Sequence, residues 1–208
     1  MSHRNADHSR GGPVDPVAGK RTLRELARAK RRAAAAAAGS EAGERLRESF
    51  LSALPLPPAQ VVAGYWPMPE EIDVRPLMTH LHLSGHVLAL PVVMARDEPL
   101  IFRRWRPSIA LDPGVYGIPV PGAEAPEATP GVLLVPLLAF DGEGRRLGYG
   151  AGYYDRTLAT LRRAGDILAI GAAYAAQRMD ALPEEAADQR LDWVVTEEGA
   201  IRTGRVAA

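Results

Sequence analysis

The chain has 208 residues, of which 47% are apolar, and its 25 basic residues balance its 25 acidic ones. This length and apolar fraction are typical of one globular domain with a sizeable core. The chain contains no cysteine, which excludes a disulfide framework, a thiolate nucleophile and a cysteine-ligated metal site. The neutral charge argues against a protein that coats nucleic acid, because no excess of cations is present to neutralise phosphates. Only two of the basic residues are lysines, Lys20 and Lys30.

Residues 1–19 are polar and contain scattered Gly and Pro. They include no apolar stretch of the kind found in signal peptides, and the chain has no uncharged apolar run as long as a membrane span. We therefore expect a disordered N-terminal tail over 1–19, a single domain over 20–208, and a cytoplasmic location.

The expected elements alternate between helices and strands along the chain. Thr22 and Glu25 fit a capping box, which predicts a first helix over 23–38. Leu46 and Phe50 lie four apart and mark the apolar stripe of a second helix. The other expected elements are, in order, a strand over 60–66, a helix over 73–83 capped by Asp73, strands over 86–94 and 100–105, a loop over 106–130, a strand over 131–140, a helix over 154–163, and strands over 167–174 and 193–196.

This alternation predicts an α/β protein whose central sheet is largely parallel. The near-continuous apolar run over 131–140 is typical of a strand that is buried on both faces. The loop over 106–130 is rich in Pro and Gly, and a loop of that length inside a compact domain is usually functional.

The stretch that follows the buried strand, F-D-G-E-G-R-R-L-G-Y-G-A-G-Y-Y-D-R, carries the strongest chemical signal. Gly148, Gly150 and Gly152 are spaced by two, so that backbone amides can approach an anion without obstruction. The helix that follows adds the positive end of its dipole. Arg145 and Arg146 add fixed charge. Together these features indicate a site for a polyphosphate at the carboxyl end of a strand, where open α/β sheets bind their ligands.

Two simpler interpretations remain open at this point. The stretch lacks the Lys-Ser/Thr of a P-loop and the glycine spacing of a dinucleotide fold, so it is equally compatible with a hairpin turn at Asp141-Gly142 followed by a glycine-rich connector. Asp155 can hold Mg²⁺ against phosphate oxygens or can simply complement the helix dipole.

The same stretch resembles the signature of the 5-formyltetrahydrofolate cyclo-ligase family, also called methenyltetrahydrofolate synthetases. The resemblance rests on R-L-G-Y-G-A-G-Y-Y-D-R following V-P-L-L-A-F-D, and three further segments agree in order: K-R-T-L-R at 20–24, the segment over 65–73, and the segment over 188–197. It covers about residues 20–199. It implies a single α/β domain of the NagB/RpiA/CoA-transferase-like type, with a largely parallel central sheet flanked by helices.

The resemblance also implies a reaction. ATP phosphorylates the formyl oxygen of 5-formyltetrahydrofolate, the neighbouring nitrogen attacks the activated carbon, and phosphate leaves to give 5,10-methenyltetrahydrofolate. The implied cofactor is Mg²⁺, with ATP as co-substrate, and the implied partners are small molecules rather than nucleic acid or membrane. We expect a monomer.

Residues are carried over from the family position by position. The resemblance implies catalytic roles for Lys20, Arg146 and Tyr153, and Mg²⁺ ligation by Asp155 and Asp188. The positions implied to bind ATP are Lys20, Arg24, Arg146, Leu147, Gly148, Tyr149, Gly150, Ala151, Gly152, Tyr153 and Tyr154. The positions implied to bind the folate are Trp66, Glu71, Tyr149, Gly150, Ala151, Gly152 and Tyr153.

Each of these residues also has a structural interpretation. A tryptophan such as Trp66 is often part of a core, Glu71 alone fits a solvated loop, and Asp188 lies in an acidic segment. Ala187, where many family members carry His, and Tyr149, which is basic in some, depart from the family pattern, as does Val120 in the long loop. The departures at Ala187 and Tyr149 keep open a folate- or nucleotide-binding regulator without turnover. The basic cluster over 21–32 keeps open an RNA-associated protein.

Overall fold

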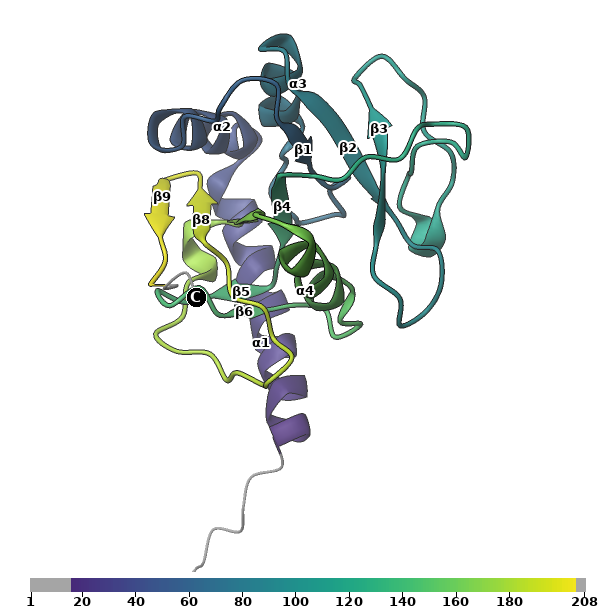
Figure 1. Ribbon diagram of the computed structural model, residues 1–208. Helices are drawn as coiled ribbons and strands as arrows, with labels where there is room; N and C mark the ends of the chain where they lie inside the picture. Colours follow the sequence, from purple (N-terminus) through teal and green to yellow (C-terminus); the bar gives the residue numbers. More distant parts are fainter. Residues whose placement is uncertain (1–15, 205–208) are drawn as a thin grey trace, which may run out of the picture.

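The computed structural model describes residues 16–204 as a seven-stranded sheet with helices on both faces (Figure 1). The helices are α1 (Pro16–Ala38), α2 (Ala42–Ala53), α3 (Arg75–Leu83) and α4 (Tyr153–Ala164), with two short 3-10 turns, η1 (Val115–Gly117) and η2 (Ala175–Gln177). The strands are β1 (Val61–Ala63), β2 (Val87–Val92), β3 (Ile101–Trp105), β4 (Val132–Pro136), β5 (Ala139–Phe140), β6 (Arg146–Leu147), β7 (Leu168–Ala172), β8 (Trp193–Thr196) and β9 (Gly199–Arg202).

The strand order is β3-β2-β1-β4-β7-β8-β9. The five strands β2, β1, β4, β7 and β8 are parallel, whereas β3 and β9 pair antiparallel at the two edges. Strand β4 lies in the middle and is buried at every position, as its apolar run predicts. The predicted α/β class with a largely parallel sheet is confirmed.

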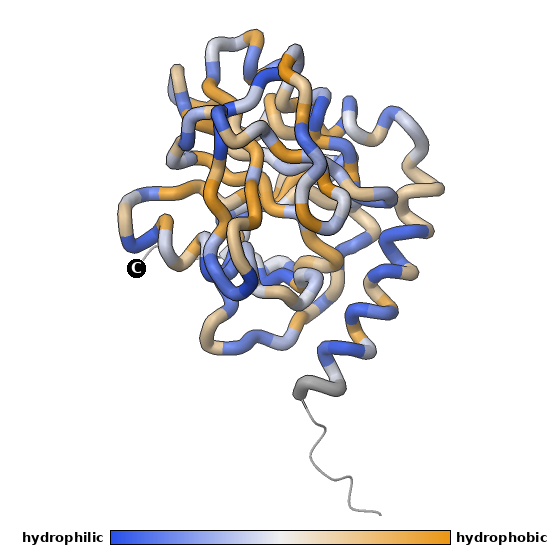
Figure 2. Tube along the Cα trace, turned by 90° about the vertical axis from the view of Figure 1, so that its right-hand side faces the viewer, coloured by the Kyte–Doolittle hydropathy of each residue, from blue (hydrophilic) through white to orange (hydrophobic). Residues whose placement is uncertain are grey.

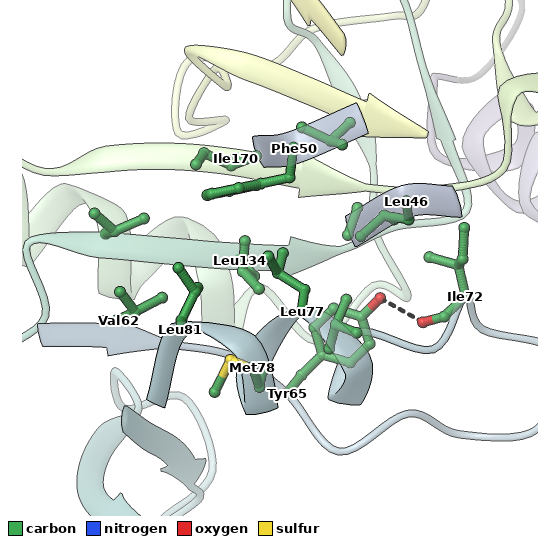
Figure 3. Close-up of a cluster of buried hydrophobic side chains, with 14 of the residues drawn as sticks. Leu46, Phe50, Val62, Tyr65, Ile72, Leu77, Met78, Leu81, Leu134 and Ile170 are labelled. Carbon is green, nitrogen blue, oxygen red and sulfur yellow. Dashed lines mark hydrogen bonds between the residues drawn. The ribbon is translucent and has the colours of Figure 1, made fainter. Parts of the chain in front are cut away.

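The two faces of the sheet are covered by different helices. Leu134 of β4 belongs to a core cluster with Phe50 of α2 and Leu77 of α3 (Figure 3). Leu133, the next residue, belongs to the opposite cluster together with Leu158 of α4. Successive residues of a strand point to opposite faces, so this one strand anchors both helical layers. Figure 2 shows hydrophobic residues along the central strands and many hydrophilic ones along α1.

Helix α1 begins at Pro16, before the predicted first helix. The predicted capping box at its start is therefore wrong, because Thr22 and Glu25 lie inside the helix; proline is tolerated in a first turn, so the helix extends toward it. Of the predicted tail, residues 1–15 lie outside the described part of the chain, and residues 16–19 are helical. No helix within residues 16–204 has the length and hydrophobicity that crossing a membrane requires.

The predicted strand over 131–140 is in fact two strands, β4 and β5. Strand β5 turns back at the predicted Asp141-Gly142 turn and pairs with β6. The buried Asp141 carboxylate holds this hairpin, because its Oδ1 accepts hydrogen bonds from the backbone N–H groups of Glu143 and Arg145 at 3.0 and 3.1 Å. The N-cap of α3 is Val74 rather than the predicted Asp73. The Asp73 carboxylate still accepts a hydrogen bond from the Arg75 N–H at 2.9 Å.

Candidate active site

A cavity of about 810 Å³ lies beyond the carboxyl ends of the parallel strands. Its wall includes Tyr65 and Trp66 just after β1, Val93 just after β2, and Pro136 at the end of β4. Strand β1 lies between β2 and β4. The chain places β2 and β3 on one side of β1, and then adds β4 and the later strands of the sheet on the other side. Such a reversal of strand order opens a crevice in which α/β proteins bind their ligands.

Every residue that the family resemblance implied for this site lines the cavity. They come from four separate segments: α1, the connection between β1 and α3, the stretch from β6 into α4, and the segment before β8. The set is Lys20, Arg24, Trp66, Glu71, Arg146, Leu147, Gly148, Tyr149, Gly150, Ala151, Gly152, Tyr153, Tyr154, Asp155 and Asp188. The fold brings them together, while their individual roles stay predictions.

The glycine-rich stretch forms a loop from β6 to the N-terminus of α4. Gly150 has φ +106° and Gly152 has φ +70°, conformations that residues with a Cβ adopt only with strain. Gly152 is the N-cap of α4, so the loop ends where the helix presents its unpaired N–H groups. The Arg24 Nε on α1 donates to the Gly148 carbonyl at 3.2 Å and fastens the loop to the first helix. The predicted hairpin turn is confirmed, and the loop that follows it has the geometry of an anion site, while phosphate binding there stays a prediction.

Charged side chains of both signs meet at the loop. The Lys20 Nζ lies 3.0 Å from Asp188 Oδ2 and 3.0 Å from Glu185 Oε1, and only 11% of its side chain is exposed. Burial lowers the pKa of Lys20, but the hydrogen bonds and charges of the two carboxylates outweigh it and the net shift is upward. The Arg146 Nη2 lies 2.7 Å from Asp155 Oδ1, which also accepts the Gln189 N–H at 2.9 Å.

The two aspartates predicted to bind Mg²⁺ are adjacent in space, because Asp155 holds the backbone of the residue that follows Asp188. Within residues 16–204 no three His, Asp or Glu side chains converge as a metal site. Mg²⁺ in phosphoryl-transfer sites is commonly held by one or two carboxylates together with phosphate oxygens and water. The donor set therefore fits Mg²⁺ that arrives with a polyphosphate, and does not fit a metal held by the protein alone.

The lining of the cavity also contains a buried carboxylate, Glu71. Its Oε1 accepts a hydrogen bond from the Tyr149 hydroxyl, and its Oε2 accepts one from the Met68 N–H at 2.8 Å. Burial raises the pKa of Glu71, and the hydrogen bonds from Tyr149 and Met68 and the charge of Arg31 oppose that rise. The Tyr149 side chain thus points to Glu71, so this departure from the family pattern changes the surroundings of this carboxylate.

An aromatic wall stands beside this carboxylate. Trp66 packs edge-on against Trp105, with ring centroids 6.0 Å apart, and the Arg75 guanidinium lies 5.2 Å from its ring centroid. The segment that carries Trp66 and Glu71 is held from inside, because the Tyr65 hydroxyl donates to the Ile72 carbonyl at 3.0 Å (Figure 3). The wall is therefore built on the core rather than on a free loop.

The sequence analysis missed several residues of the site. Val115, Tyr116 and Ile118, from the long loop over 106–130, line the cavity together with Val120; the length of that loop was the only signal for them. Arg31 was hidden in the basic cluster over 21–32. The predicted contribution of Arg145 is wrong, because its guanidinium is bound to Asp141 at 2.6 Å and it does not line the cavity.

The comparison with known proteins agrees with this geometry. The model of the 5-formyltetrahydrofolate cyclo-ligase family matches residues 16–197. The chain belongs to this family. The resemblance that the sequence motifs indicated is thereby confirmed, and the chain is an enzyme of the cyclo-ligase type.

Curated members of the family are similar over nearly their whole length. The 5-formyltetrahydrofolate cyclo-ligase of Escherichia coli K12 is 31% identical over 82% of this chain and 96% of its own, and that of Mycolicibacterium smegmatis is 34% identical over 85% and 93%. The solved structure of Aquifex aeolicus 5,10-methenyltetrahydrofolate synthetase superposes with a TM-score of 0.73 at 30% identity, covering 91% of this chain and 95% of that one. This cyclo-ligase family member therefore aligns with nearly the whole length of these relatives.

Proposed function

We propose that this protein catalyses the ATP- and Mg²⁺-dependent cyclisation of 5-formyltetrahydrofolate to 5,10-methenyltetrahydrofolate, with release of ADP and phosphate. The observation that carries the proposal is one cavity lined by two unlike groups of residues. One group, called the phosphate end here, is the glycine-rich loop at a helix N-terminus with Lys20 and Arg146, and the other, called the folate end, is the buried carboxylate of Glu71 with Trp66. A polyphosphate suits the first end, and a flat ring with an amino-pyrimidine edge suits the second.

The chemistry requires both ends at once. The formyl oxygen attacks the terminal phosphorus of ATP and ADP departs; the neighbouring nitrogen then forms a bond to the formyl carbon and loses its proton, and the C–O bond to the phosphorylated oxygen breaks. Phosphate takes the oxygen away. The protein has to align the two substrates and neutralise charge on the moving phosphoryl group. No nucleophilic side chain is needed, which is consistent with a chain without cysteine.

At the phosphate end, the loop N–H groups and the N-terminus of α4 bind the phosphate chain, and Lys20 and Arg146 supply positive charge. Both cations are paired with carboxylates of the same site, so a phosphate takes over a cation that is already desolvated and oriented. Asp155 and Asp188 would hold Mg²⁺, whose chemistry is to neutralise phosphate oxygens.

At the folate end, Glu71 accepts hydrogen bonds from the amino-pyrimidine edge and Trp66 covers a ring face. The carboxylate is held by the Met68 N–H and the Tyr149 hydroxyl, yet each oxygen retains a further lone pair for a ligand. Aliphatic and aromatic residues of the long loop also line the cavity, and an apolar lining limits the access of water to a reactive phosphorylated intermediate.

The test is an absorbance assay for the methenyl product with purified protein, 5-formyltetrahydrofolate, ATP and Mg²⁺. We expect product formation that requires ATP and is accompanied by equal ADP release. Folded protein that gives no product refutes the proposal. Stabilisation of the protein against heat by the two ligands without any ADP release would identify it as the alternative, a binding regulator.

We further propose that the protein acts in the cytoplasm as a monomer and on small molecules, without nucleic acid or membrane. The contacts of the basic cluster argue against an RNA-binding helix. Arg24 and Arg31 face the body of the protein, and Arg32 is paired with Glu70 at 2.7 Å. Light scattering after gel filtration tests the monomer. An RNA affinity that falls steeply with added salt would contradict the absence of nucleic acid.

A further inference from the structure

Arg31 is a buried cation behind the folate end of the cavity. Only 8% of its side chain is exposed, compared with 71% for the neighbouring Arg32. It does not line the cavity. It lies on the same face of α1 as Lys20 and Arg24, because it follows Lys20 by eleven residues and Arg24 by seven, which are helical spacings. Moving a guanidinium out of water into this position has a substantial free-energy cost, and the contacts of the guanidinium must offset that cost.

The contacts of Arg31 lead to Glu71. Its Nη1 donates to the Tyr149 hydroxyl, and that hydroxyl donates to Glu71 Oε1. The same Nη1 lies 3.8 Å from Glu71 Oε1, and the guanidinium carbon lies 5.5 Å from the centroid of the Tyr149 ring. Among residues 16–204, Arg31 is the only cation within ion-pair distance of Glu71. The three side chains form a directed chain: guanidinium, hydroxyl, carboxylate.

The backbone that presents Glu71 is itself held in a strained turn. Glu71 donates its N–H to the Met68 carbonyl at 3.0 Å, and Glu70 between them has φ +68°. This geometry is that of a turn that normally has glycine at the third position, so Glu70 stores about 1 kcal/mol of strain. Arg31 and Arg32 pair with Glu70 at 3.9 and 2.7 Å, which fastens the strained turn to α1.

We propose that Arg31 is a positioning residue that, through the Tyr149 hydroxyl, orients Glu71 and keeps it ionised for the amino-pyrimidine edge of the folate. The inference rests on the proposed function. It assigns the Tyr149 side chain to the folate and leaves only the backbone of Tyr149 to the phosphate loop. The Tyr149 hydroxyl donates to Glu71 and accepts from Arg31, and a hydroxyl that accepts a hydrogen bond from a cation becomes a stronger donor to the carboxylate.

The charge of Glu71 depends on all the groups around it. Without Arg31, burial is opposed only by the hydrogen bonds from Tyr149 and Met68, so the pKa of Glu71 rises further. The uncharged carboxyl accepts paired hydrogen bonds less well than the carboxylate. The titratable and charged groups that face Glu71 are Arg31 of α1, Glu70 of the turn, Tyr149 of the loop, Tyr65 after β1, Tyr154 of α4 and Tyr174 before η2.

The experiment compares Arg31→Met with Arg28→Met, a substitution at an exposed position on the same helix. ADP release is measured as a function of pH and of each substrate. For Arg31→Met we expect the KM for 5-formyltetrahydrofolate to rise roughly tenfold or more at pH 7, with the KM for ATP within about twofold of wild type. The acid limb of kcat/KM for the folate moves to higher pH, and Arg31→Lys returns it toward wild type. Arg28→Met leaves all of these values unchanged.

Tyr149→Phe keeps the test decisive if Arg31→Met does not fold. It removes only the bridging hydroxyl, and we expect the same rise in the folate KM. In the double variant the two effects do not add, because both act through one path. An unchanged folate KM and pH profile in folded Arg31→Met, or additive effects in the double variant, would overturn the inference.

The outcome for Arg31 is separable from that of the proposed function. If the wild type binds 5-formyltetrahydrofolate, as shown by quenching of tryptophan fluorescence, but releases no ADP, the proposed function fails. The dissociation constant for the folate then replaces KM in the same comparison. A wild type that turns over, with Arg31→Met behaving like Arg28→Met, refutes the role of Arg31 alone.

Discussion

Lys20→Met separates the roles of the two lysines of the chain. Lys20 lies inside α1 with its Nζ 3.0 Å from both Asp188 and Glu185. Lys30, on the same helix, is exposed and donates to the Arg178 carbonyl at 2.7 Å. Met removes the ammonium and keeps most of the apolar stem, so Lys30→Met is a matched control.

The structure sets the expected size of the stability effect. Glu185 is 56% exposed, so its ion pair contributes little, about 0.5 kcal/mol. The hydrogen bond to Asp188, which is 28% exposed, contributes about 1 kcal/mol. Losing both lowers the melting temperature by roughly 3–6 °C in a chain of this length. The predicted first helix over 23–38 would place Lys20 outside it, whereas Lys20 lies inside α1, which begins at Pro16.

The stability effect also depends on pH in a defined direction. The pKa of Lys20 is raised in the folded protein, so its ion pairs stabilise the fold below the ordinary lysine pKa of 10.5. That contribution is lost as the pH rises through the folded value. The difference in melting temperature between wild type and Lys20→Met should therefore be constant near neutrality and shrink only at strongly alkaline pH.

The effect on activity should be larger than the effect on stability. A charge-assisted contact with phosphate contributes about 1.5–3 kcal/mol, so we expect the KM for ATP to rise about 10- to 100-fold in Lys20→Met. The KM for the folate should change little. The assay is ADP release at saturating folate, with melting measured on the same samples. A KM for ATP within about twofold of wild type, or an equal rise in Lys30→Met, would refute the role given to Lys20.

Three further substitutions test the remaining parts of the site and core. Asp155→Asn keeps an oxygen for its two hydrogen bonds but removes the charge, so the Mg²⁺ concentration for half-maximal rate should rise roughly tenfold; an unchanged Mg²⁺ titration would contradict its role. Gly150→Ala, at φ +106°, should lower stability by about 1–2 kcal/mol and weaken ATP binding, as checked by urea unfolding and by KM. Leu134→Ala, at 1% exposure in β4, should lower the free energy of unfolding by about 2–5 kcal/mol without changing either KM.

Elements with a strong local pattern were predictable from the sequence. The apolar run of β4 and the stripe on α2 agree with the structure because burial on two faces, or on one stripe of a helix, demands that pattern. Strands β6 and β9 were missed. They have two and four residues, which is too short for any periodicity, and their pairing with β5 and β8 depends on the turn between them rather than on their own residues.

The members of the site were predictable from motifs, but their contacts were not. The glycine loop has a local signature, since φ values such as those of Gly150 and Gly152 require glycine. Arg31 has no such signature, because it lies among other arginines and its burial depends on a turn about 40 residues away. Tyr149 stands in the glycine-rich loop at a position that is basic in some family members. The sequence does not show that its side chain turns toward Glu71, which the tertiary structure decides.

The two lysines show the same division. The sequence by itself determined that the chain has only two lysines and that one of them falls in a family motif. Only the tertiary structure decided that Lys20 is buried against Asp188, 168 residues away, and that Lys30 stays exposed while it donates to the Arg178 carbonyl. The physical reason is that the chemical type of a side chain is local, whereas its desolvation and its partners depend on which distant segments the fold packs against it.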